Sequence, residues 1–400
     1  MIKSLALIFL IGLSMAWICK VIKLPRIIGM LVTGIILGGA CLDLIDTSII
    51  TRELSLELRQ IALIIILIKA GLSLNLSDLK KAGRPAILLS FLPATFEMLA
   101  FWLIGPLLLP ITGLEGLLMG AVLGAVSPAV VIPRMTKLID EGYGRDKALP
   151  EMIIAGSSVD DIFVMVLFYA FLGMLKSGTL DAMSFLNIPT SIILGVMLGI
   201  MVGIVLVKFF ESFYIAGHHI RNSMKVIIIL GYAFLLMAVE ESLDGVVAIS
   251  GLLAIITMAA VIAMKSIPYV TGRLSAKFGK LWLAAEVILF VLVGADVQVD
   301  SLVSAGAGAV AMIFIGLAFR SVGTFLCLIK TKLNIKERLY TIIAYIPKAT
   351  VQAAIGSVPL AAGLACGEIV LTVAVLSILI TAPLGAILMD ATYKKLLTKC

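Results

Sequence analysis

The sequence is poor in the residues on which soluble enzymes and disulfide-stabilised domains depend. Of its 400 residues only 14% are charged, two are histidine and five are cysteine. The cysteines form no CxxC pair and show no metal-ligand spacing, so neither a disulfide framework nor a zinc site is predicted. Hydrophobic residues make up 62% and the mean hydropathy is +1.19. These values lie well beyond those of soluble domains and predict an all-α polytopic membrane protein.

Apolar runs long enough to cross about 30 Å of hydrocarbon recur along the whole chain. We count thirteen: 4–19, 26–42, 60–76, 85–109, 112–133, 149–174, 184–207, 225–240, 246–264, 279–295, 302–329, 339–363 and 368–389. The connections between them are too short to hold a soluble domain. We therefore expect residues 1–400 to form a single transmembrane domain, in contact with lipid.

The basic residues predict the orientation, because short cytoplasmic loops collect Lys and Arg. Assigning loops alternately to the two sides places 24 basic residues on one side and 4 on the other, with three more inside the runs. This split favours an odd number of crossings, with the N-terminus outside and the C-terminus in the cytoplasm. The net charge of +7 then reflects topology, so nucleic-acid binding is not predicted.

One constant offset of 223 residues aligns three parts of the chain and indicates an internal repeat. The matched positions are segment 71–79 with 294–302, Glu97 with Arg320, and Ser127 with Thr350. The matched runs are seven crossings apart, an odd number, so the second copy is inverted in the membrane. We predict two inverted five-helix repeats, 26–174 and 246–389, joined by linker helices at 184–240.

The fourth helix of each repeat is expected to be discontinuous. In the first copy Ser127 and Pro128 lie mid-membrane, and a proline removes a backbone donor and frees a carbonyl one turn earlier. In the second copy Pro347 precedes an unusually polar cluster: Lys348, Thr350 and Gln352. Broken helices direct helix dipoles and unpaired carbonyls at a central site. Ser127 and Thr350, one at each break, are therefore candidate cation-binding residues.

Seven charged residues lie in the interior of the runs, away from their ends, and leaving them unpaired would cost roughly 2.5 to 3.5 kcal/mol each. They are Lys69, Glu97, Asp160, Asp161, Glu286, Arg320 and Lys348. Glu97 and Arg320 occupy equivalent positions in the two repeats, so we predict that they pair, mainly in a structural role. Lys69 and Glu286 receive no role.

Asp160 and Asp161 stand side by side in one apolar run and have no acidic counterpart at the repeat offset. Neighbours on a helix point about 100° apart, so one carboxylate can face a cation path while the other meets a basic group. Lys348 is the predicted basic partner of one of the two carboxylates. Ser157, one turn before Asp161, adds a hydroxyl on the same face. Such oxygens suit Na⁺ or Li⁺, and the site can exchange either ion for a proton.

Three motifs resemble those of the cation/proton antiporter superfamily, in particular the NHA-type sodium/proton exchangers of its CPA2 branch. They are GAVSPAVVIPRM, SSVDDIF and PKATVQAAIGS. The resemblance covers nearly the whole chain. It implies a thirteen-helix, NhaA-like antiporter fold in which a core domain moves against a dimerisation domain in an elevator-like exchange.

By the same resemblance, Asp161 is the main cation and proton carrier. Asp160, beside it, is then the carboxylate that we expect to pair with Lys348. Lys348 and Arg320 are the basic residues of the core, and Glu97 pairs with Arg320. The core would contain the fourth to sixth and eleventh to thirteenth runs. The first to third and eighth to tenth would form the dimer side, joined by the seventh.

Two alternative transporter classes and one enzyme class remain. A potassium/proton antiporter of the same superfamily would carry a soluble nucleotide-binding domain, which this sequence does not show. A sodium-coupled organic anion symporter shares the repeat architecture but needs no adjacent aspartates. An intramembrane aspartyl protease needs its two aspartates on different helices. We therefore expect a non-enzymatic homodimeric exchanger without cofactor, in a bacterial inner membrane.

Overall fold

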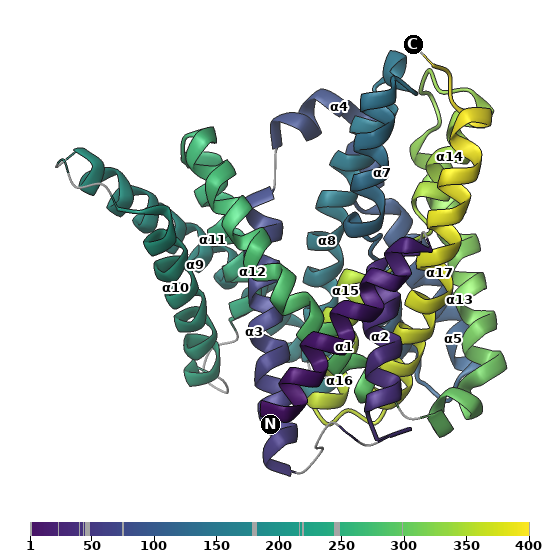
Figure 1. Cartoon of the computed structure of the whole chain (residues 1–400), viewed down its shortest axis with the longest axis horizontal. Helices are drawn as coiled ribbons and strands as arrows, with labels where there is room; N and C mark the ends of the chain where they lie inside the picture. The colour runs from purple at the N-terminus through teal and green to yellow at the C-terminus, as the bar shows by residue number, and fades with distance from the viewer. Residues whose placement is uncertain are drawn as a thin grey trace. The chain divides into compact units, whose positions relative to one another are not determined.

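A computed structural model describes the chain except for residues 1, 23, 40, 43, 45–48, 74–75, 178–181, 216, 218–219, 244–248, 298 and 400. The described residues form helices joined by short connections (Figure 1). They divide into two compact units. Unit 1 contains residues 1–56, 76–171 and 287–400, and unit 2 contains residues 57–75 and 172–286.

Unit 1 holds most of the helices. They are α1 (Ile2–Val21), α2 (Arg26–Leu37), α4 (Leu76–Leu89), α5 (Leu92–Leu108), α6 (Gly113–Leu123), α7 (Pro128–Glu141), α13 (Val299–Cys327), α14 (Ile335–Ala344), α15 (Thr350–Gly356), α16 (Val358–Ala361) and α17 (Gly367–Leu396), with a 3-10 turn at Arg145–Lys147. Unit 2 holds α9 (Ala182–Ile215), α10 (Asn222–Leu243) and α11 (Gly251–Lys265). Three helices contribute residues to both units: α3 (Ile49–Ser73), α8 (Leu149–Ser177) and α12 (Pro268–Ala295).

The apolar helices agree with the predicted runs. Within the described part of the chain, nine segments are long and apolar enough to cross a membrane by length and composition, and each falls on a predicted run. Three shorter apolar helices, Arg26–Leu37, Gly251–Lys265 and Thr350–Ala361, fall on three more. The chain is an integral membrane protein, whereas the count of thirteen crossings and the inverted repeat stay predictions. The predicted tenth run, 279–295, is too short, because α12 begins at Pro268 and its first half is polar.

Both predicted interruptions are present. Residues 124–127 separate α6 from α7, and residues 345–349 separate α14 from α15. The first half of each interrupted helix begins with a capping box, formed by Thr112 with Glu115 in α6 and by Asn334 with Glu337 in α14. In both cases the local sequence stabilises the beginning of the helix with a capping box, and the helix is then interrupted before it reaches its full length.

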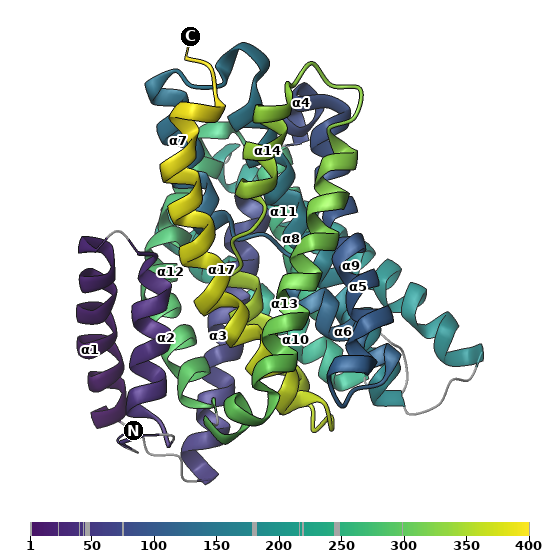
Figure 2. The same ribbon diagram turned by 90° about the vertical axis from the view of Figure 1, so that its right-hand side faces the viewer.

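In unit 1, α5 packs against α6 and α13, and α17 packs against α13, α14 and α15 (Figure 2). The first two helices pack against each other and also belong to this unit, where Gly34 of α2 lies against the backbone of Val291 at the end of α12. This differs from the grouping implied by the resemblance, which placed the first two runs with the eighth to tenth. In unit 2, Gly195, Gly199 and Gly203 bring α9 close to α11, as small residues do between membrane helices.

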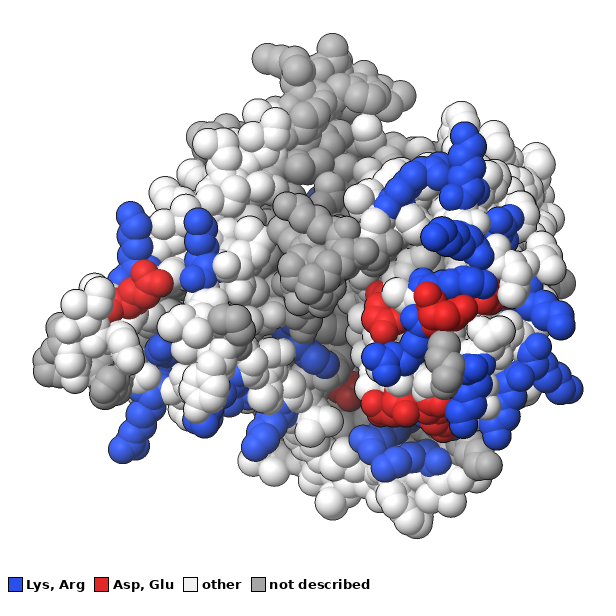
Figure 3. Space-filling view, turned by 90° about the horizontal axis from the view of Figure 1, so that it is seen from above, with Lys and Arg blue, Asp and Glu red and all other residues white. Residues whose placement is uncertain are grey.

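The first and last helices of the chain have their outer ends at opposite ends of unit 1. Helix α1 begins at one end of the unit and α17 ends at the other (Figures 1 and 2). Lys and Arg gather at the end where α17 finishes (Figure 3). There Tyr143 bridges to Lys399, and Lys147 bonds to Glu337 at 2.8 Å. Three loops that the sequence assigned to one side therefore lie together.

Candidate functional site

The aspartate pair lies in the middle of α8. Asp160 is completely buried and Asp161 is 7% exposed. Oδ2 of Asp160 accepts two hydrogen bonds, at 2.8 Å from the Val126 N–H and at 3.1 Å from the guanidinium of Arg320. One oxygen of each aspartate, Oδ1, has no hydrogen-bond partner within the described part of the protein. Asp160 is thus anchored on one side only, and both carboxylates keep a free oxygen.

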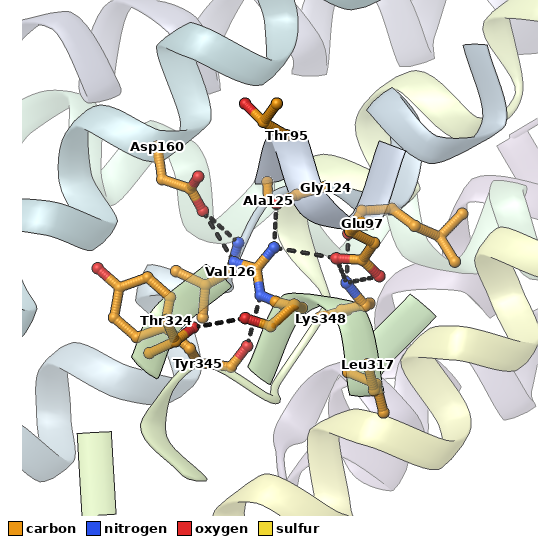
Figure 4. Close-up of polar contacts among 12 residues, drawn as sticks. Thr95, Glu97, Gly124, Ala125, Val126, Asp160, Leu317, Thr324, Tyr345 and Lys348 are labelled. Carbon is orange, nitrogen blue, oxygen red and sulfur yellow. Dashed lines mark hydrogen bonds and ion pairs between the residues drawn. The ribbon is translucent and has the colours of Figure 1, made fainter. Parts of the chain in front are cut away.

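Glu97 is the second acidic centre of the site. It lies on α5, fully buried, and accepts a hydrogen bond from Arg320 of α13 at 3.0 Å. The pair predicted from the repeat offset is therefore present. Lys348 donates to the same carboxylate at 2.8 Å, and its Nζ lies 2.7 Å from the other oxygen. Figure 4 shows Asp160 and Glu97 on opposite sides of Gly124, Ala125 and Val126.

The predicted partnership of Asp160 with Lys348 is wrong. Asp160 pairs with Arg320, and Lys348 pairs with Glu97. The physical reason is that the guanidinium carries several donors in a fixed fork and can bond to two carboxylates at once, whereas the ammonium is a point charge. Arg320 therefore bridges Asp160 and Glu97, while Lys348 neutralises Glu97 from its other side.

Both basic side chains also bind the interrupted backbone. Arg320 donates to the carbonyl oxygens of Gly124 and Tyr345, the latter at 2.8 Å, and Lys348 donates to the carbonyl of Leu123. The two interruptions meet directly, because the Ser127 N–H donates to the Pro347 carbonyl at 2.8 Å. Backbone groups that the breaks remove from the helix ladder are in this way satisfied by the charged cluster and by each other.

Four residues support this arrangement that sequence reasoning did not assign to the site. Thr381 of α17 accepts the Lys348 N–H at 3.0 Å. Gly385, one turn later, lies under Pro347, where an added Cβ would come within 2.4 Å of the ring. Gly156 of α8 likewise leaves space for the hydroxyl of Tyr345. Threonine and glycine one turn apart in an apolar helix are a weak signal for such a contact.

The three predicted hydroxyls are all buried. Ser127 lies at the start of α7, and its oxygen has no partner among the described residues. Ser157, one turn before Asp161, donates to the Ile154 carbonyl at 3.1 Å, which leaves its oxygen lone pairs available. Thr350 begins α15. Lys69 and Glu286 belong to unit 2, where Lys69 lies 5.6 Å from the ring centre of Trp282.

The charge balance singles out Asp161. The cluster contains three carboxylates and two basic groups. Arg320 and Lys348 direct their bonds to Asp160, to Glu97 and to backbone carbonyls. If all five groups are ionised, one negative charge remains in a buried site, where an isolated charge is costly. A proton or a small cation at Asp161 removes that charge.

Comparison with known proteins agrees with this chemistry. Residues 5–392 match the family model described as sodium/hydrogen exchanger, transmembrane. Sodium/hydrogen exchanger 9B2 of Homo sapiens is 35% identical over 392 residues, which cover 94% of this chain and 70% of that protein. Sodium/hydrogen exchanger 9B1 of Homo sapiens is 32% identical over 94% of this chain and 73% of that protein.

The fold is also known among solved structures. The sodium proton antiporter MjNhaP1 from Methanocaldococcus jannaschii superposes with a TM-score of 0.81 at 21% identity, over 99% of this chain and 98% of that one. The helical arrangement built around the two broken helices is thus shared. Together with the whole-chain family match, this shows that the chain belongs to the sodium/hydrogen exchanger family.

Proposed function

We propose that this protein exchanges Na⁺ or Li⁺ for H⁺ across the membrane, with the cation and the proton competing for Asp161. The observation that carries the proposal is the imbalance of three buried carboxylates against two basic groups, of which Arg320 pairs with Asp160 and Glu97 and Lys348 pairs with Glu97. A neutral site requires one proton or one monovalent cation at a time. Competition for a single position couples the two fluxes.

Each remaining residue has a distinct part in this scheme. Asp160 supplies a second, anchored carboxylate beside the carrier, and its free oxygen can share the cation. The hydroxyl oxygens of Ser127, Ser157 and Thr350 are the neutral ligands that a hard cation prefers once it loses water. Glu97, Arg320 and Lys348 hold the two broken helices together and do not bind the ion.

Transport requires that the site face the two sides of the membrane in turn. We propose that the core helices α5 to α8 and α13 to α17 move as one body, in an elevator-like exchange, and that two copies associate through helices outside the core. The N-terminus is placed outside and the C-terminus inside, on the basis of the 24 to 4 division of basic residues. A bacterial inner membrane is proposed only from the short loops, since the relatives named above are human proteins.

The test uses purified protein in liposomes loaded with a pH-sensitive dye. We expect an inward gradient of Na⁺ or Li⁺ to drive protons out, and a K⁺ gradient to have little effect. Asp161→Asn should abolish exchange, whereas Asp390→Asn, which alters a half-exposed aspartate paired with Arg134 at the protein surface, should not. Full sodium-dependent proton movement in Asp161→Asn would refute the carrier assignment. Cross-linking of the wild type in liposomes tests the dimer.

A further inference from the structure

Gln352 is a completely buried amide on α15, within the second broken helix. Its Nε2 donates to two carbonyl oxygens of the first broken segment, that of Ala125 at 2.8 Å and that of Leu123 at 3.4 Å. Its Oε1 has no hydrogen-bond partner in the described part of the protein. The side chain therefore links the two interruptions through its nitrogen alone.

The Ala125 carbonyl and the Val126 N–H belong to the same peptide group. A peptide is planar, and in the trans form its C=O and N–H point in opposite directions. The carbonyl of this peptide accepts from Gln352 at 2.8 Å, and its N–H donates to Asp160 Oδ2, also at 2.8 Å. Gln352 and Asp160 thus hold the two edges of one rigid plane, without touching each other.

Hydrogen bonds in such a chain strengthen one another, since each polarises the next. The peptide lies in a segment without helical bonds of its own, so its orientation depends on its partners. Arg320 and Lys348 hold the neighbouring carbonyls of Gly124 and Leu123. The Ala125 carbonyl is the one that Gln352 holds at the shortest distance, and it is directly coupled to the carboxylate.

We infer that Gln352 is a positioning residue for ion exchange, which orients the Ala125–Val126 peptide so that its N–H fixes Asp160 beside Asp161. The amide nitrogen performs this role. Without it the peptide is free to turn, and Asp160 loses its backbone donor while keeping Arg320. Only the transport readout below rests on the proposed function, because the hydrogen-bond relay exists whatever the protein carries.

The first experiment tests the relay without transport. Gln352→Met, Asp160→Asn and the double variant are compared by thermal unfolding in detergent. The fall in Tm caused by Gln352→Met should shrink to half or less in the Asp160→Asn background, because the relay then ends on a weaker acceptor. Ser377→Ala removes a buried hydroxyl that, among the described residues, bonds to the Ala374 carbonyl of its own helix, and it should cost the same in both backgrounds. Equal losses for Gln352→Met in both backgrounds would overturn the inference. If Gln352→Met does not fold, Gln352→Asn, whose amide is too short to reach Ala125, takes its place.

The second experiment measures sodium-dependent exchange in liposomes over a range of Na⁺ concentrations. Gln352→Met and Gln352→Glu both lack the donating nitrogen, and each should raise the apparent KM for Na⁺ about five- to tenfold, the effect of one lost hydrogen bond, with a smaller change in maximal rate. If Gln352→Glu kept the wild-type KM while Gln352→Met raised it, the side-chain oxygen of residue 352 would account for the effect, and our proposal would be contradicted. Absence of exchange in the wild type would instead refute the proposed function, and the unfolding cycle would still decide the role of Gln352.

Discussion

The N–H of Ser127 donates to the carbonyl oxygen of Pro347 at 2.8 Å, and these two residues lie at the interruptions of two different helices. Each interruption has a proline at or beside it, Pro128 directly after the first and Pro347 within the second. Proline leaves backbone groups without helical partners. Here the group left over at one break is satisfied by the other, so the two breaks stabilise each other and fix the point where the helices cross.

The two aspartates should respond oppositely to the same substitution. Asp161→Asn removes the unbalanced buried charge and should raise thermal stability, by about 1 to 3 kcal/mol in the free energy of unfolding. Asp160→Asn removes the negative partner of Arg320 and should lower it by a similar amount. Thermal unfolding in detergent at pH 8 measures both. A loss of stability in Asp161→Asn would show that its charge is balanced by a group outside the cluster.

Glu97 and Lys348 should be energetically coupled. Lys348→Met in the wild type leaves Glu97 with one cation fewer and should cost about 3 to 5 kcal/mol. In a Glu97→Gln background the same change should cost less, and the difference in the free energy of unfolding should be roughly 0.5 to 3 kcal/mol. A double-mutant cycle from denaturant unfolding measures the difference. Arg134→Met, which breaks a surface pair with Asp390, is the control and should give the same change in both backgrounds.

Gly385→Ala should push α17 away from Pro347 in the second interruption, and so lower stability. The added methyl would lie 2.4 to 2.7 Å from the Pro347 ring, so the backbone has to shift. Overpacking of this kind costs about 1 to 3 kcal/mol, and exchange should be slowed because Lys348 moves with Pro347. Gly231→Ala is the matched control, since nothing lies within 4 Å of its Cβ position. It should leave stability unchanged or raise it slightly. Equal effects of the two substitutions would argue against the close contact.

The Lys147–Glu337 pair should make stability depend on pH in the alkaline range. Glu337 raises the pKa of Lys147 above its ordinary value, chiefly through their hydrogen bond. A raised folded-state pKa means that the stabilisation is complete below the unfolded-state value, about 10.4, and is lost as the pH rises through the folded-state value. Lys147→Met should therefore lower Tm at pH 8 and have a smaller effect at pH 11. Lys336→Met, which alters an exposed lysine next to Glu337, should show no such trend.

The parts of the site that the sequence predicted all leave a local mark. Proline marks the two breaks, and the 223-residue offset predicts the pairing of Glu97 with Arg320 that the structure shows. The choice of Lys348 between Glu97 and Asp160 leaves no such mark. It depends on how far α5 and α8 are rotated about their own axes, and apolar periodicity is too uniform in a membrane helix to fix that rotation.

Contacts between side chains and the backbone were the least predictable. Gln352 stood out in the sequence as part of a polar cluster, but its partners are carbonyls of Leu123 and Ala125, which any residue would supply. Thr381 likewise accepts a hydrogen bond from the backbone N–H of Lys348, and the backbone carbonyl of Tyr345 accepts one from Arg320. Such contacts can be predicted only when it is known that the two interruptions lie next to each other.

The pairing of Asp160 with Arg320 has a consequence for biogenesis. The two residues are 160 positions apart, and Glu97 precedes Arg320 by 223. At a synthesis rate of about 5 to 20 residues per second, Asp160 waits roughly 10 to 30 s for its guanidinium to leave the ribosome. All three carboxylates of the cluster are made before either cation. The nascent first half therefore has to enter the bilayer with its acids protonated or sheltered by the insertion machinery, and its tertiary structure closes only when the last third of the chain arrives.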